Sequence, residues 1–490
     1  MRGKANYIRW LPCVLFLLGA VRTAAAGRVI YVDDDAVGAN DGSSWIDAFS
    51  DLQDAITMAQ AGDEIHVAQG IYTPTQDPLD RDATFQLKDG VSIIGGYAGL
   101  TGMYPDFHHT KFFATILSGD IDYNDDGMDP NSKEGNSRHV VTCTGPGNAA
   151  VLDGVTITGG YTGGARPHTQ DGAGGGLYCQ GSSPQLTDCG FADNYDAVYV
   201  SSNSYPVFTR CIWEDNHAGS GAAIFADRSS SLSLNHCVFR RNTADLRGGA
   251  IYANSNSCLS LNHCVFRRNT ADLRGGAIYA DGGEMQLINC LFVANTAGET
   301  GGAISCPDYN HANGSTILNV LNCTFYNNTF PTFYKPPTNS VKQPDGSRVY
   351  TSGSIITNCI FYNKPSYMAV AFEFGRSEPL IITSIYEKEP KSGQPRPVPP
   401  MPDVLFVDPD GADGILGTED DDFRLAPGSP AIDSGTNETE PPLPPMDLDG
   451  NPRILNVIVD LGAYEFTGVF YVDDDARYII PNNLLEGTGK

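Results

Sequence analysis

A perfect internal duplication constrains this chain more than any other feature. Residues 232–253 read LSLNHCVFRRNTADLRGGAIYA, and the same 22 letters return at residues 259–280, an offset of 27 residues. A repeat of this length is one structural unit that is too small to bury an apolar face alone, so neighbouring units must stack to form a continuous core. The duplication therefore predicts a solenoid in which each unit forms one coil.

Weaker copies of the unit extend the repeat in both directions. Each marker cysteine is followed after two positions by an aromatic residue, and each of the first six is followed after five positions by asparagine. The marker cysteines are Cys189, Cys211, Cys237, Cys264, Cys290, Cys323 and Cys359. The apolar segments around them are too short for helices, and Gly, Asn, Asp and Ser supply turns between them. This pattern predicts an all-β, right-handed parallel β-helix, in which equivalent residues stack at roughly 4.8 Å.

Several motifs also resemble known families. The pairing of Gly-Gly-Ala-Ile with Phe-x-x-Asn, as at residues 239–242 and 266–269, resembles the repeats of chlamydial polymorphic outer membrane proteins. This resemblance covers residues 152–363 and implies a surface adhesin built on a β-helix. YVDDDA, GANDGSSW and AF-x-x-LQ-x-A near the start resemble exported β-helix proteins of planctomycetes. The fold is, by analogy, similar to the pectin-lyase-like solenoid.

The chain begins with a segment that is typical of export. Basic residues precede an apolar run at residues 10–21, and three alanines end at Ala26, which predicts a signal peptide over residues 1–26. The run of about a dozen apolar residues falls short of the ~20 that span a membrane. The protein is therefore expected to be secreted or displayed at the cell surface, with no transmembrane span in the mature chain.

The rest of the chain divides into four segments. Residues 27–385 are predicted to form the β-helix, with a short capping helix where residues 48–60 show helical spacing. Residues 386–403 are Pro-rich and form a loop or linker. Residues 404–466 are expected to supply the C-terminal coils and an irregular cap. Residues 467–490 form a tail in which VFYVDDDA echoes VIYVDDDA at residues 29–36, as the start of another unit or a separate edge strand.

Charge and cysteine content narrow the partners. Cleavage after Ala26 leaves 27 basic against 58 acidic residues, a net charge of about −31, which argues against nucleic acid and anionic membranes and favours calcium. No organic cofactor is expected, and the oligomeric state is open.

Eleven cysteines remain after cleavage of the signal peptide. Equivalent residues in adjacent parallel coils have parallel Cα–Cβ vectors, a poor geometry for disulfides, so the seven marker cysteines are predicted to be stacked free thiols.

Two acidic loops are candidate calcium sites because they alternate oxygen-bearing side chains with glycine turns. The candidate ligands are Asp120, Asp122, Asn124, Asp126 and Asp129 in the first loop, and Asp408, Asp410 and Asp413 in the second. The first loop begins like an EF-hand, but its twelfth position is Lys133 instead of glutamate. The alternative for both loops is a solvated acidic turn.

A charged patch is the second candidate site. The residues just before each ladder asparagine vary, and stacking would bring the acidic and basic ones together on neighbouring coils. The patch consists of Asp193, Glu214, Asp215, Arg240, Arg241, Arg267 and Arg268. These residues form either salt bridges on a solvated face or a groove whose arginines bind an acidic glycan.

Two functions follow from these observations. The near-identical repeats and the adhesin-like motifs favour an exported scaffold that binds a polysaccharide or a cell-surface glycan, stiffened by calcium. The alternative is an enzyme of the pectin-lyase-like fold, either a polysaccharide lyase with an arginine or lysine as base or a glycoside hydrolase with paired carboxylates. No catalytic residues can be assigned from the sequence, so whether the protein is an enzyme stays open.

Overall fold

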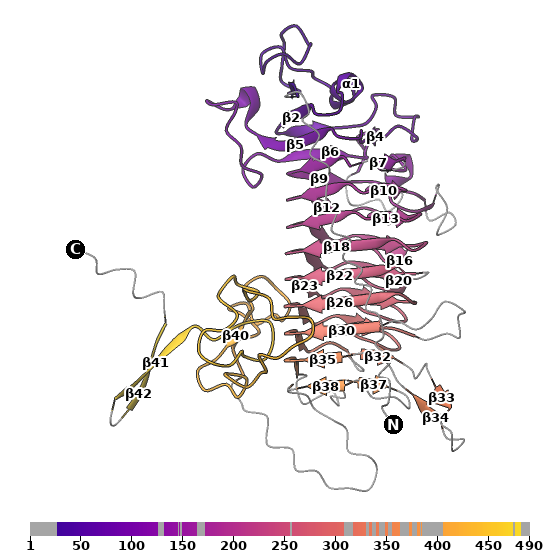
Figure 1. The fold of residues 1–490 in the computed structure, drawn as a ribbon. Helices are drawn as coiled ribbons and strands as arrows, with labels where there is room; N and C mark the ends of the chain where they lie inside the picture. Colours follow the sequence, from indigo (N-terminus) through magenta and orange to yellow (C-terminus); the bar gives the residue numbers. More distant parts are fainter. Residues whose placement is uncertain are drawn as a thin grey trace, which may run out of the picture.

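The computed structural model is an elongated stack of coils with a smaller module against one side (Figure 1). It describes residues 27–125, 132–145, 147, 149–163, 172–254, 257–307, 317–329, 333–335, 340–342, 348–350, 355–362, 372–374, 380–382, 384, 405–473 and 476–481. The signal peptide predicted over residues 1–26 and the Pro-rich segment at 386–403 lie outside the described residues.

Sheet A is the longest of the parallel sheets that form the walls of the solenoid. In the described residues it contains twelve strands, all parallel to their neighbours. In order along the sheet they are β1 (Val29–Val32), β2 (Glu64–Ala68), β5 (Ser92–Tyr97), β8 (Val151–Asp153), β11 (Gln185–Thr187), β14 (Val207–Thr209), β18 (Ser231–Asn235), β22 (Cys258–Asn262), β26 (Glu284–Ile288), β30 (Ile317–Leu321), β35 (Ile355–Thr357) and β38 (Leu380–Ile382).

Sheet B is the second wall and carries the aromatic residues that follow the marker cysteines. Its ten described strands are β3 (Gly70–Tyr72), β6 (Thr115–Ser118), β9 (Val155–Thr158), β12 (Gly190–Ala192), β15 (Ile212–Glu214), β19 (Val238–Arg240), β23 (Val265–Arg267), β27 (Leu291–Val293), β31 (Thr324–Tyr326) and β36 (Ile360–Tyr362). Except for β6, which follows β5 after residues 98–114, each described strand of sheet B follows a strand of sheet A after a corner of one or two residues.

Sheet C closes the coil, and a short sheet D lies between sheets B and C. The ten described strands of sheet C are β4 (Phe85–Gln86), β7 (Val141–Thr144), β10 (Leu177–Gln180), β13 (Val198–Ser201), β17 (Ile224–Ala226), β21 (Ile251–Ala253), β25 (Ile278–Ala280), β29 (Ile304–Ser305), β32 (Phe333–Lys335) and β37 (Phe372–Phe374). Sheet D contains β16 (His217–Ser220), β20 (Thr243–Arg247), β24 (Thr270–Ala271) and β28 (Thr296–Ala297).

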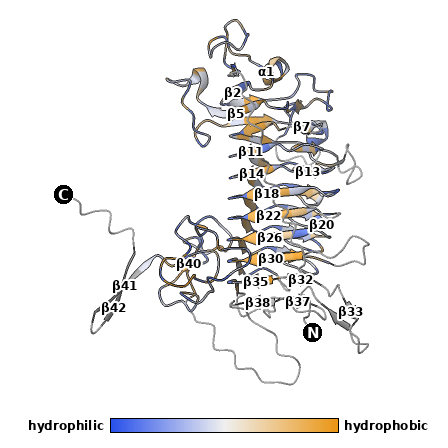
Figure 2. Ribbon diagram, viewed as in Figure 1, coloured by the Kyte–Doolittle hydropathy of each residue, from blue (hydrophilic) through white to orange (hydrophobic). Residues whose placement is uncertain are grey.

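The two identical segments form two successive coils in perfect register. Leu232 pairs with Leu259 in sheet A, and Phe239 pairs with Phe266 in sheet B. The rings of Phe239 and Phe266 stack with centroids 4.5 Å apart and planes within 4°. Both phenylalanines are fully buried, and hydrophobic residues concentrate along the stacked strands (Figure 2). The parallel β-helix that the repeat predicts is confirmed.

The ladder asparagines form a hydrogen-bonded column along the corner that follows sheet B. Asn242 Nδ2 donates to Asn269 Oδ1 at 2.9 Å, and Asn269 Nδ2 donates in turn to Asn295 Oδ1 at 2.9 Å. The ladder asparagines do not adopt the left-handed backbone conformation themselves. The residue before each of them does, with φ of 55° at Arg241 and 53° at Arg268. The asparagine side chains therefore satisfy buried backbone groups of the corner.

The cysteines behave as small apolar residues. Every cysteine in the described residues is a free thiol, which confirms the prediction for the seven marker cysteines. Cys237 and Cys264, from the two identical segments, are completely buried. Cys258 lies outside the column of marker cysteines and is only half-buried.

A single turn-and-helix segment covers the N-terminal end of the solenoid. Helix α1 (Leu52–Met58) begins after Asp51, whose carboxylate accepts a hydrogen bond from Gln53 N at 2.8 Å and so satisfies a free N–H of the first turn. The helix buries Leu52, Ala55 and Ile56 against the first coil. This arrangement confirms the short capping helix, although it is shorter than the predicted 48–60.

Residues 405–466 form a compact unit, which we call the C-terminal module, and it lies on the side of the solenoid (Figure 1). Its strands β39 (Phe406–Asp408) and β40 (Asp422–Leu425) pair antiparallel. The sequence suggested terminal coils and a cap, whereas the described residues pack sideways on the outer face of sheet B. The reason is that the outward residues of β27, β31 and β36 are apolar or aromatic, except Thr324, which accepts a hydrogen bond from Ala463 N. The packed residues include Leu291, Val293, Tyr326 and Ile360 of sheet B, and Phe406, Phe423, Leu461 and Tyr464 of the module.

Polar contacts fix the module in place. The amide of Asn358 donates to Thr436 O at 3.0 Å and accepts from Thr436 N at 2.9 Å. Arg453, with 1% of its side chain exposed, lies 3.3 Å from Glu465 through Nε and Oε1. Burial lowers the pKa of Arg453 and raises the pKa of Glu465 to about 8. The apolar core and the Asn358–Thr436 hydrogen bonds thus join the module to the solenoid, whereas the Arg453–Glu465 pair lies inside the module.

The remaining described elements are short. The 3₁₀ helices are η1 (Gly99–Thr101) and η2 (Ser132–Gly135). Strands β33 (Ser340–Lys342) and β34 (Arg348–Tyr350) pair antiparallel, as do β41 (Gly468–Asp473) and β42 (Ala476–Pro481) in the tail. The repeated motif VFYVDDDA therefore begins in a hairpin strand, unlike its counterpart in β1, which pairs parallel with β2.

Candidate functional site

The outer face of sheet B presents two columns of side chains to solvent or to the C-terminal module. In β19 and its neighbours the middle residue points into the core, because side chains alternate along a strand. Phe239 is fully buried, whereas Val238 and Arg240 on either side of it are partly exposed. Each coil therefore contributes an outward first residue and an outward third residue to this face.

The chemistry of this face changes along the solenoid axis. The outward third residues, in strand order, are Ala192, Glu214, Arg240, Arg267, Val293 and Tyr326. The corner residues that follow are Asp193, Asp215, Arg241, Arg268, Ala294 and Asn327. Acidic coils are thus followed by the two duplicated basic coils and then by apolar coils. The C-terminal module covers the apolar coils and ends at the basic ones.

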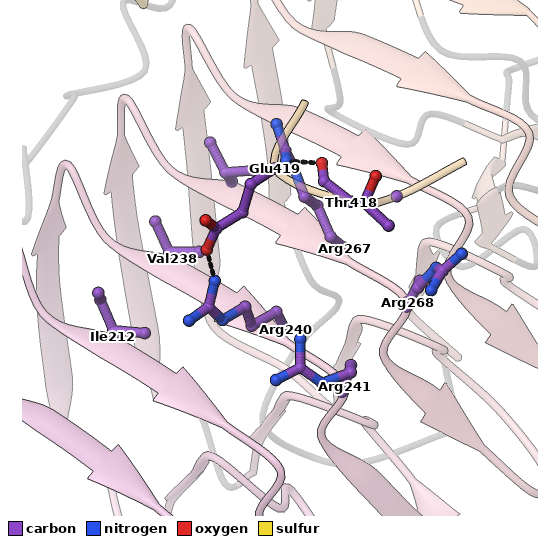
Figure 3. Close-up of a pocket in the computed structure, with 10 residues that line it drawn as sticks. Ile212, Val238, Arg240, Arg241, Arg267, Arg268, Thr418 and Glu419 are labelled. Atoms are coloured by element: carbon purple, nitrogen blue, oxygen red, sulfur yellow. Dashed lines mark hydrogen bonds and ion pairs between the residues drawn. The ribbon is translucent and has the colours of Figure 1, made fainter. Parts of the chain in front are cut away.

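A pocket of about 370 Å³ lies where the module meets the basic coils (Figure 3). Its walls are four arginines of the predicted patch, Arg240, Arg241, Arg267 and Arg268. Ile212, Val238 and Val265 form an apolar column along its floor. A loop of the C-terminal module, residues 417–419, closes one side.

The arginines of the first duplicated coil are held by carboxylates of the coil before it. Arg240 Nε donates to Glu214 Oε2 at 2.7 Å, and its Nη2 lies 2.6 Å from the same oxygen. Arg241 Nη2 lies 2.7 Å from Asp215 Oδ2 and 3.3 Å from Glu214 Oε2. The hydrogen bond to Asp215 raises the pKa of Arg241. Arg240 also forms an ion pair through Nη1 with Glu419 of the module loop.

The arginines of the second duplicated coil contact the module through backbone carbonyls. Arg267 Nη1 donates to Thr418 O, and burial lowers the pKa of Arg267 below its ordinary value. Arg267 Nε is buried and has no hydrogen-bond partner in the described residues. Arg268 Nε donates to Leu416 O at 2.7 Å. Within the described residues, neither of these two guanidinium groups forms an ion pair with a carboxylate.

Gly417 allows the loop to lie directly on this basic surface. Its φ is +89°, a backbone conformation that favours glycine. A Cβ at this position would lie 2.8 Å from Cγ of Arg268. A side chain at residue 417 would therefore push the loop away from the second duplicated coil.

The structure brings six of the seven predicted patch residues into one connected group. Asp193 lies on the adjacent corner, where its carboxylate and its carbonyl accept hydrogen bonds from Lys133 of the η2 segment. Asp193 thus pairs with Lys133 and not with the arginines of the patch. The sequence did not predict the apolar column on the floor or the docking of residues 416–419 on the arginines. Ile212, Val238 and Val265 recur at the same position of successive coils, and this recurrence could have indicated an apolar column. No local pattern indicated that a loop some 150 residues away would cover that column.

Of the proposed calcium ligands, Asp120 and Asp122 are partly buried, whereas Asn124, Asp408 and Asp413 are exposed. Asp126 and Asp129 lie outside the described residues, whereas Asp120 Oδ1 accepts from Asn124 N at 3.1 Å, and Asp122 Oδ2 accepts from Asn124 Nδ2 at 2.7 Å. In the second loop, Asp408 O accepts from Gly411 N, Asp410 is partly exposed, and Asp413 Oδ1 accepts from Ile415 N at 2.7 Å. The described carboxylates of neither loop converge on one point. Calcium binding at these loops stays a prediction.

A group of three aspartates does converge at the N-terminal end. Oxygens of Asp33, Asp34 and Asp35 lie within 4.8 Å of one another. Both oxygens of Asp33 accept backbone hydrogen bonds, from Asp35 N at 3.0 Å and from Leu100 N at 2.7 Å. Burial raises the pKa of Asp33 and of Asp34. Asp33 thereby ties the loop after β1 to η1.

Comparison with known proteins identifies the architecture. Residues 139–330 match a family model described as a right handed beta helix region. The fold is a right-handed parallel β-helix. Together with the stacked parallel sheets, this match confirms the all-β fold that the repeat predicts.

Solved structures with a similar course of the chain are only distantly related. Pectate lyase Pel9A is 15% identical with a TM-score of 0.45, and the alignment covers 91% of this chain and 98% of that chain. A rhamnogalacturonan lyase is 13% identical with a TM-score of 0.46, covering 82% and 97%. Pectin methylesterase PemA from Erwinia chrysanthemi is 12% identical with a TM-score of 0.33, covering 73% and 94%. A comparison with curated protein sequences finds no match.

Similarities this distant carry no inference about activity, so the function has to be argued from the pocket itself. No helix among the described residues is long and apolar enough to cross a membrane.

Proposed function

We propose that this protein is an exported glycan-binding scaffold whose site is the arginine pocket between the duplicated coils and the C-terminal module. The ligand class is a glycan that carries carboxylates. The single observation that carries the proposal is a pocket of about 370 Å³ with four arginines on its walls, in a chain whose net charge is −27.

Electrostatics support an anionic ligand. In the described lining of the pocket, the arginines face one carboxylate, that of Glu419. Glu214 and Asp215 hold Arg240 and Arg241 from the neighbouring coil, so these guanidinium groups are oriented before a ligand arrives. Arg267 and Arg268 pair with carbonyl oxygens, which leaves their positive charge without a carboxylate partner in the described residues. Arginine binds carboxylates through paired hydrogen bonds, which fits such a site.

The floor of the pocket supports a sugar as the carrier of the anion. Ile212, Val238 and Val265 present branched aliphatic side chains in one column beside the arginines. Sugar rings combine polar edges with apolar C–H faces, and binding sites of roughly 300–1,000 Å³ combine apolar walls with a few placed polar groups. A uronate residue would place its ring on this column and its carboxylate against an arginine.

A binding measurement with matched variants tests the proposal. The purified chain would be titrated with oligogalacturonate and with a neutral maltooligosaccharide by isothermal titration calorimetry. We expect binding of the acidic oligosaccharide only, with Kd raised about tenfold to a hundredfold in Arg267→Gln, because a charge-assisted hydrogen bond contributes ~1.5–3 kcal/mol. Arg210→Gln is the control, since Arg210 pairs with Asp188 outside the pocket. Equal loss in both variants, or binding of the neutral sugar alone, would contradict the proposal.

A polysaccharide lyase is a second candidate, and one observation favours it. Such a reaction needs a base that removes a proton beside the uronate carboxylate. Burial under the loop lowers the pKa of Arg267, in the direction that a basic role requires. The described lining of the pocket has one carboxylate, at Glu419, which fits a hydrolase with two carboxylates less well.

Polymer cleavage distinguishes a scaffold from an enzyme. The chain would be incubated with a panel of uronate-rich and neutral polysaccharides, with and without calcium, while unsaturated ends and reducing ends are followed. New unsaturated ends that disappear in Arg267→Gln would establish the lyase. Retained binding with no new ends of either kind would establish the scaffold.

A further inference from the structure

The arginine pocket already contains a carboxylate, supplied by the chain itself. Glu419 of the module loop reaches across the pocket and forms an ion pair with Arg240 Nη1 (Figure 3). Building on the binding function proposed above, we infer that Glu419 is an internal competitor. It occupies the carboxylate subsite on Arg240 until the carboxylate of a bound glycan displaces it.

Arg240 is prepared to receive two carboxylates on two different edges. Its Nε and Nη2 face Glu214 Oε2 at 2.7 and 2.6 Å, and this contact uses one edge of the guanidinium group. Nη1 points away from Glu214 and toward Glu419. Because Glu214 keeps Arg240 oriented when Glu419 leaves, the subsite persists for an incoming carboxylate.

The contact of Glu419 is exposed and therefore weak. Its side chain is 78% exposed, whereas that of Arg240 is 23% exposed. Exposed ion pairs contribute ~0–1 kcal/mol, so a ligand that also covers the apolar floor would compete successfully. The carboxylate of Glu419 thus lowers the apparent affinity for an acidic glycan without preventing its binding.

Displacement of Glu419 requires only a side-chain movement. The loop is held by its own hydrogen bonds and by the solenoid: Gly417 N donates to Asp421 Oδ2 at 2.6 Å within the module, and Arg268 Nε donates to Leu416 O at 2.7 Å. Leu416 packs against the apolar core between module and solenoid. Rotation about the side-chain bonds of Glu419 is a fast local motion, and it opens Arg240 without moving the module.

The internal competitor also defines the ligand. A group that replaces Glu419 must carry a carboxylate at the place where Glu419 carries one, next to the column formed by Ile212 and Val238. This requirement selects acidic oligosaccharides with carboxylates on the sugar ring. A neutral oligosaccharide cannot displace Glu419 from Arg240 and gains nothing from its removal.

The experiment compares Glu419→Gln with Glu438→Gln. Glu438 is an exposed acid of the same module outside the pocket, so both variants lose the same charge. Titration with oligogalacturonate is expected to show binding that is roughly twofold to fivefold tighter for Glu419→Gln, the fold-change that loss of an exposed ion pair of up to ~1 kcal/mol allows. Glu438→Gln is expected to bind like the unaltered chain. Thermal unfolding of both variants checks that the fold is kept.

The outcomes separate this inference from the function it rests on. Equal affinity of Glu419→Gln and Glu438→Gln, in a chain whose binding is lost in Arg267→Gln, overturns the internal competitor and leaves the binding function in place. Absence of oligogalacturonate binding in all variants overturns both. Tighter binding of neutral maltooligosaccharide by Glu419→Gln would also overturn the inference, because it would show that the gain does not come from a carboxylate subsite.

Discussion

The two duplicated coils have the same sequence over 22 residues, yet their outward arginines contact different partners on the outer face of the solenoid. In the first coil, Arg240 and Arg241 pair with carboxylates of the preceding coil. In the second coil, Arg267 and Arg268 pair with carbonyl oxygens of the C-terminal module. The difference teaches that position along the stack, and not the repeat itself, decides what an outward residue contacts.

The same two coils are equivalent inside the solenoid. Phe239 and Phe266 are both fully buried, and each stacks on a neighbouring ring on both sides. Asn242 and Asn269 donate equivalent hydrogen bonds to Trp213 O and Phe239 O. Inward residues meet the residues at the equivalent positions of the neighbouring coils, so the repeat fixes their surroundings.

The largest expected effect tests the inward equivalence. Phe239→Asp and Phe266→Asp should each abolish cooperative unfolding, because a carboxylate buried in the stack has no partner and the cost exceeds several kcal/mol. Circular dichroism during thermal unfolding measures the loss. Leu246→Asp is the control on the same coils, since Leu246 is 49% exposed. An unchanged melting temperature for either phenylalanine variant would show that the column faces outward.

The next effect concerns a coil that departs from the duplicated pair. Asp196 follows Tyr195 in the corner, at the place where the later coils carry Ala218 and Ala244. Burial raises the pKa of Asp196 to about 8, far above that of the unfolded chain. The unfolded chain releases this proton near pH 4 and the folded chain holds it to about pH 8. Stability contributed by this group is therefore present at low pH and is lost as pH rises between those values.

Chemical denaturation at pH 5 and pH 8 measures this dependence. We expect the unaltered chain to lose on the order of a few kcal/mol of unfolding free energy over that interval, and Asp196→Asn to lose less. Glu465, whose pKa burial also raises to about 8, contributes with the same sign in both proteins and cancels in the difference. An equal loss in the two proteins would mean that Asp196 is ionised in the folded chain.

A smaller effect should separate the duplicated histidines. His263 is 7% exposed, and its Nε2 lies 3.3 Å from Met446 O of the module, whereas His236 is exposed. The two rings stack on each other with centroids 4.6 Å apart, so either substitution removes that stacking. His263→Ala should therefore destabilise the protein by about 1 kcal/mol more than His236→Ala, the contribution of a partly buried hydrogen bond. Urea denaturation measures both, and equal effects would contradict the docking of the module on the second coil.

The smallest expected effect tests the acidic loop of the C-terminal module at residues 408–413. If residues 408–413 bind calcium, addition of the ion at its Kd should raise the melting temperature by about one degree, because a ligand at its Kd contributes ~0.4 kcal/mol. Asp413→Asn should remove the increase, and magnesium serves as the control ion. A melting temperature that is unchanged by calcium in the millimolar range would identify the loop as a solvated acidic turn.

The sequence predicted one half of the candidate site and could not predict the other. Stacking at one strand spacing places Arg240 next to Arg267, and this follows from the repeat offset alone. Glu419, Thr418 and Gly417 lie about 150 residues further along the chain, and no periodic pattern connects them with the coils. The same stacking rule grouped Asp193 with the arginines, but Asp193 forms its ion pair with Lys133, which comes from an inserted loop.

The repeat is enough to fix the coil, its register and its core. A 22-residue identity leaves Phe239 on Phe266 and Asn242 on Asn269 as the one arrangement that buries every inward residue. The repeat does not fix what covers the outer face, because that depends on the docking of residues 405–466 on the apolar side chains of Leu291 and Val293, which only the folded chain shows. Inward contacts are local in the repeat and follow from its period, whereas outward contacts join distant segments and follow from surface complementarity, which the period does not encode.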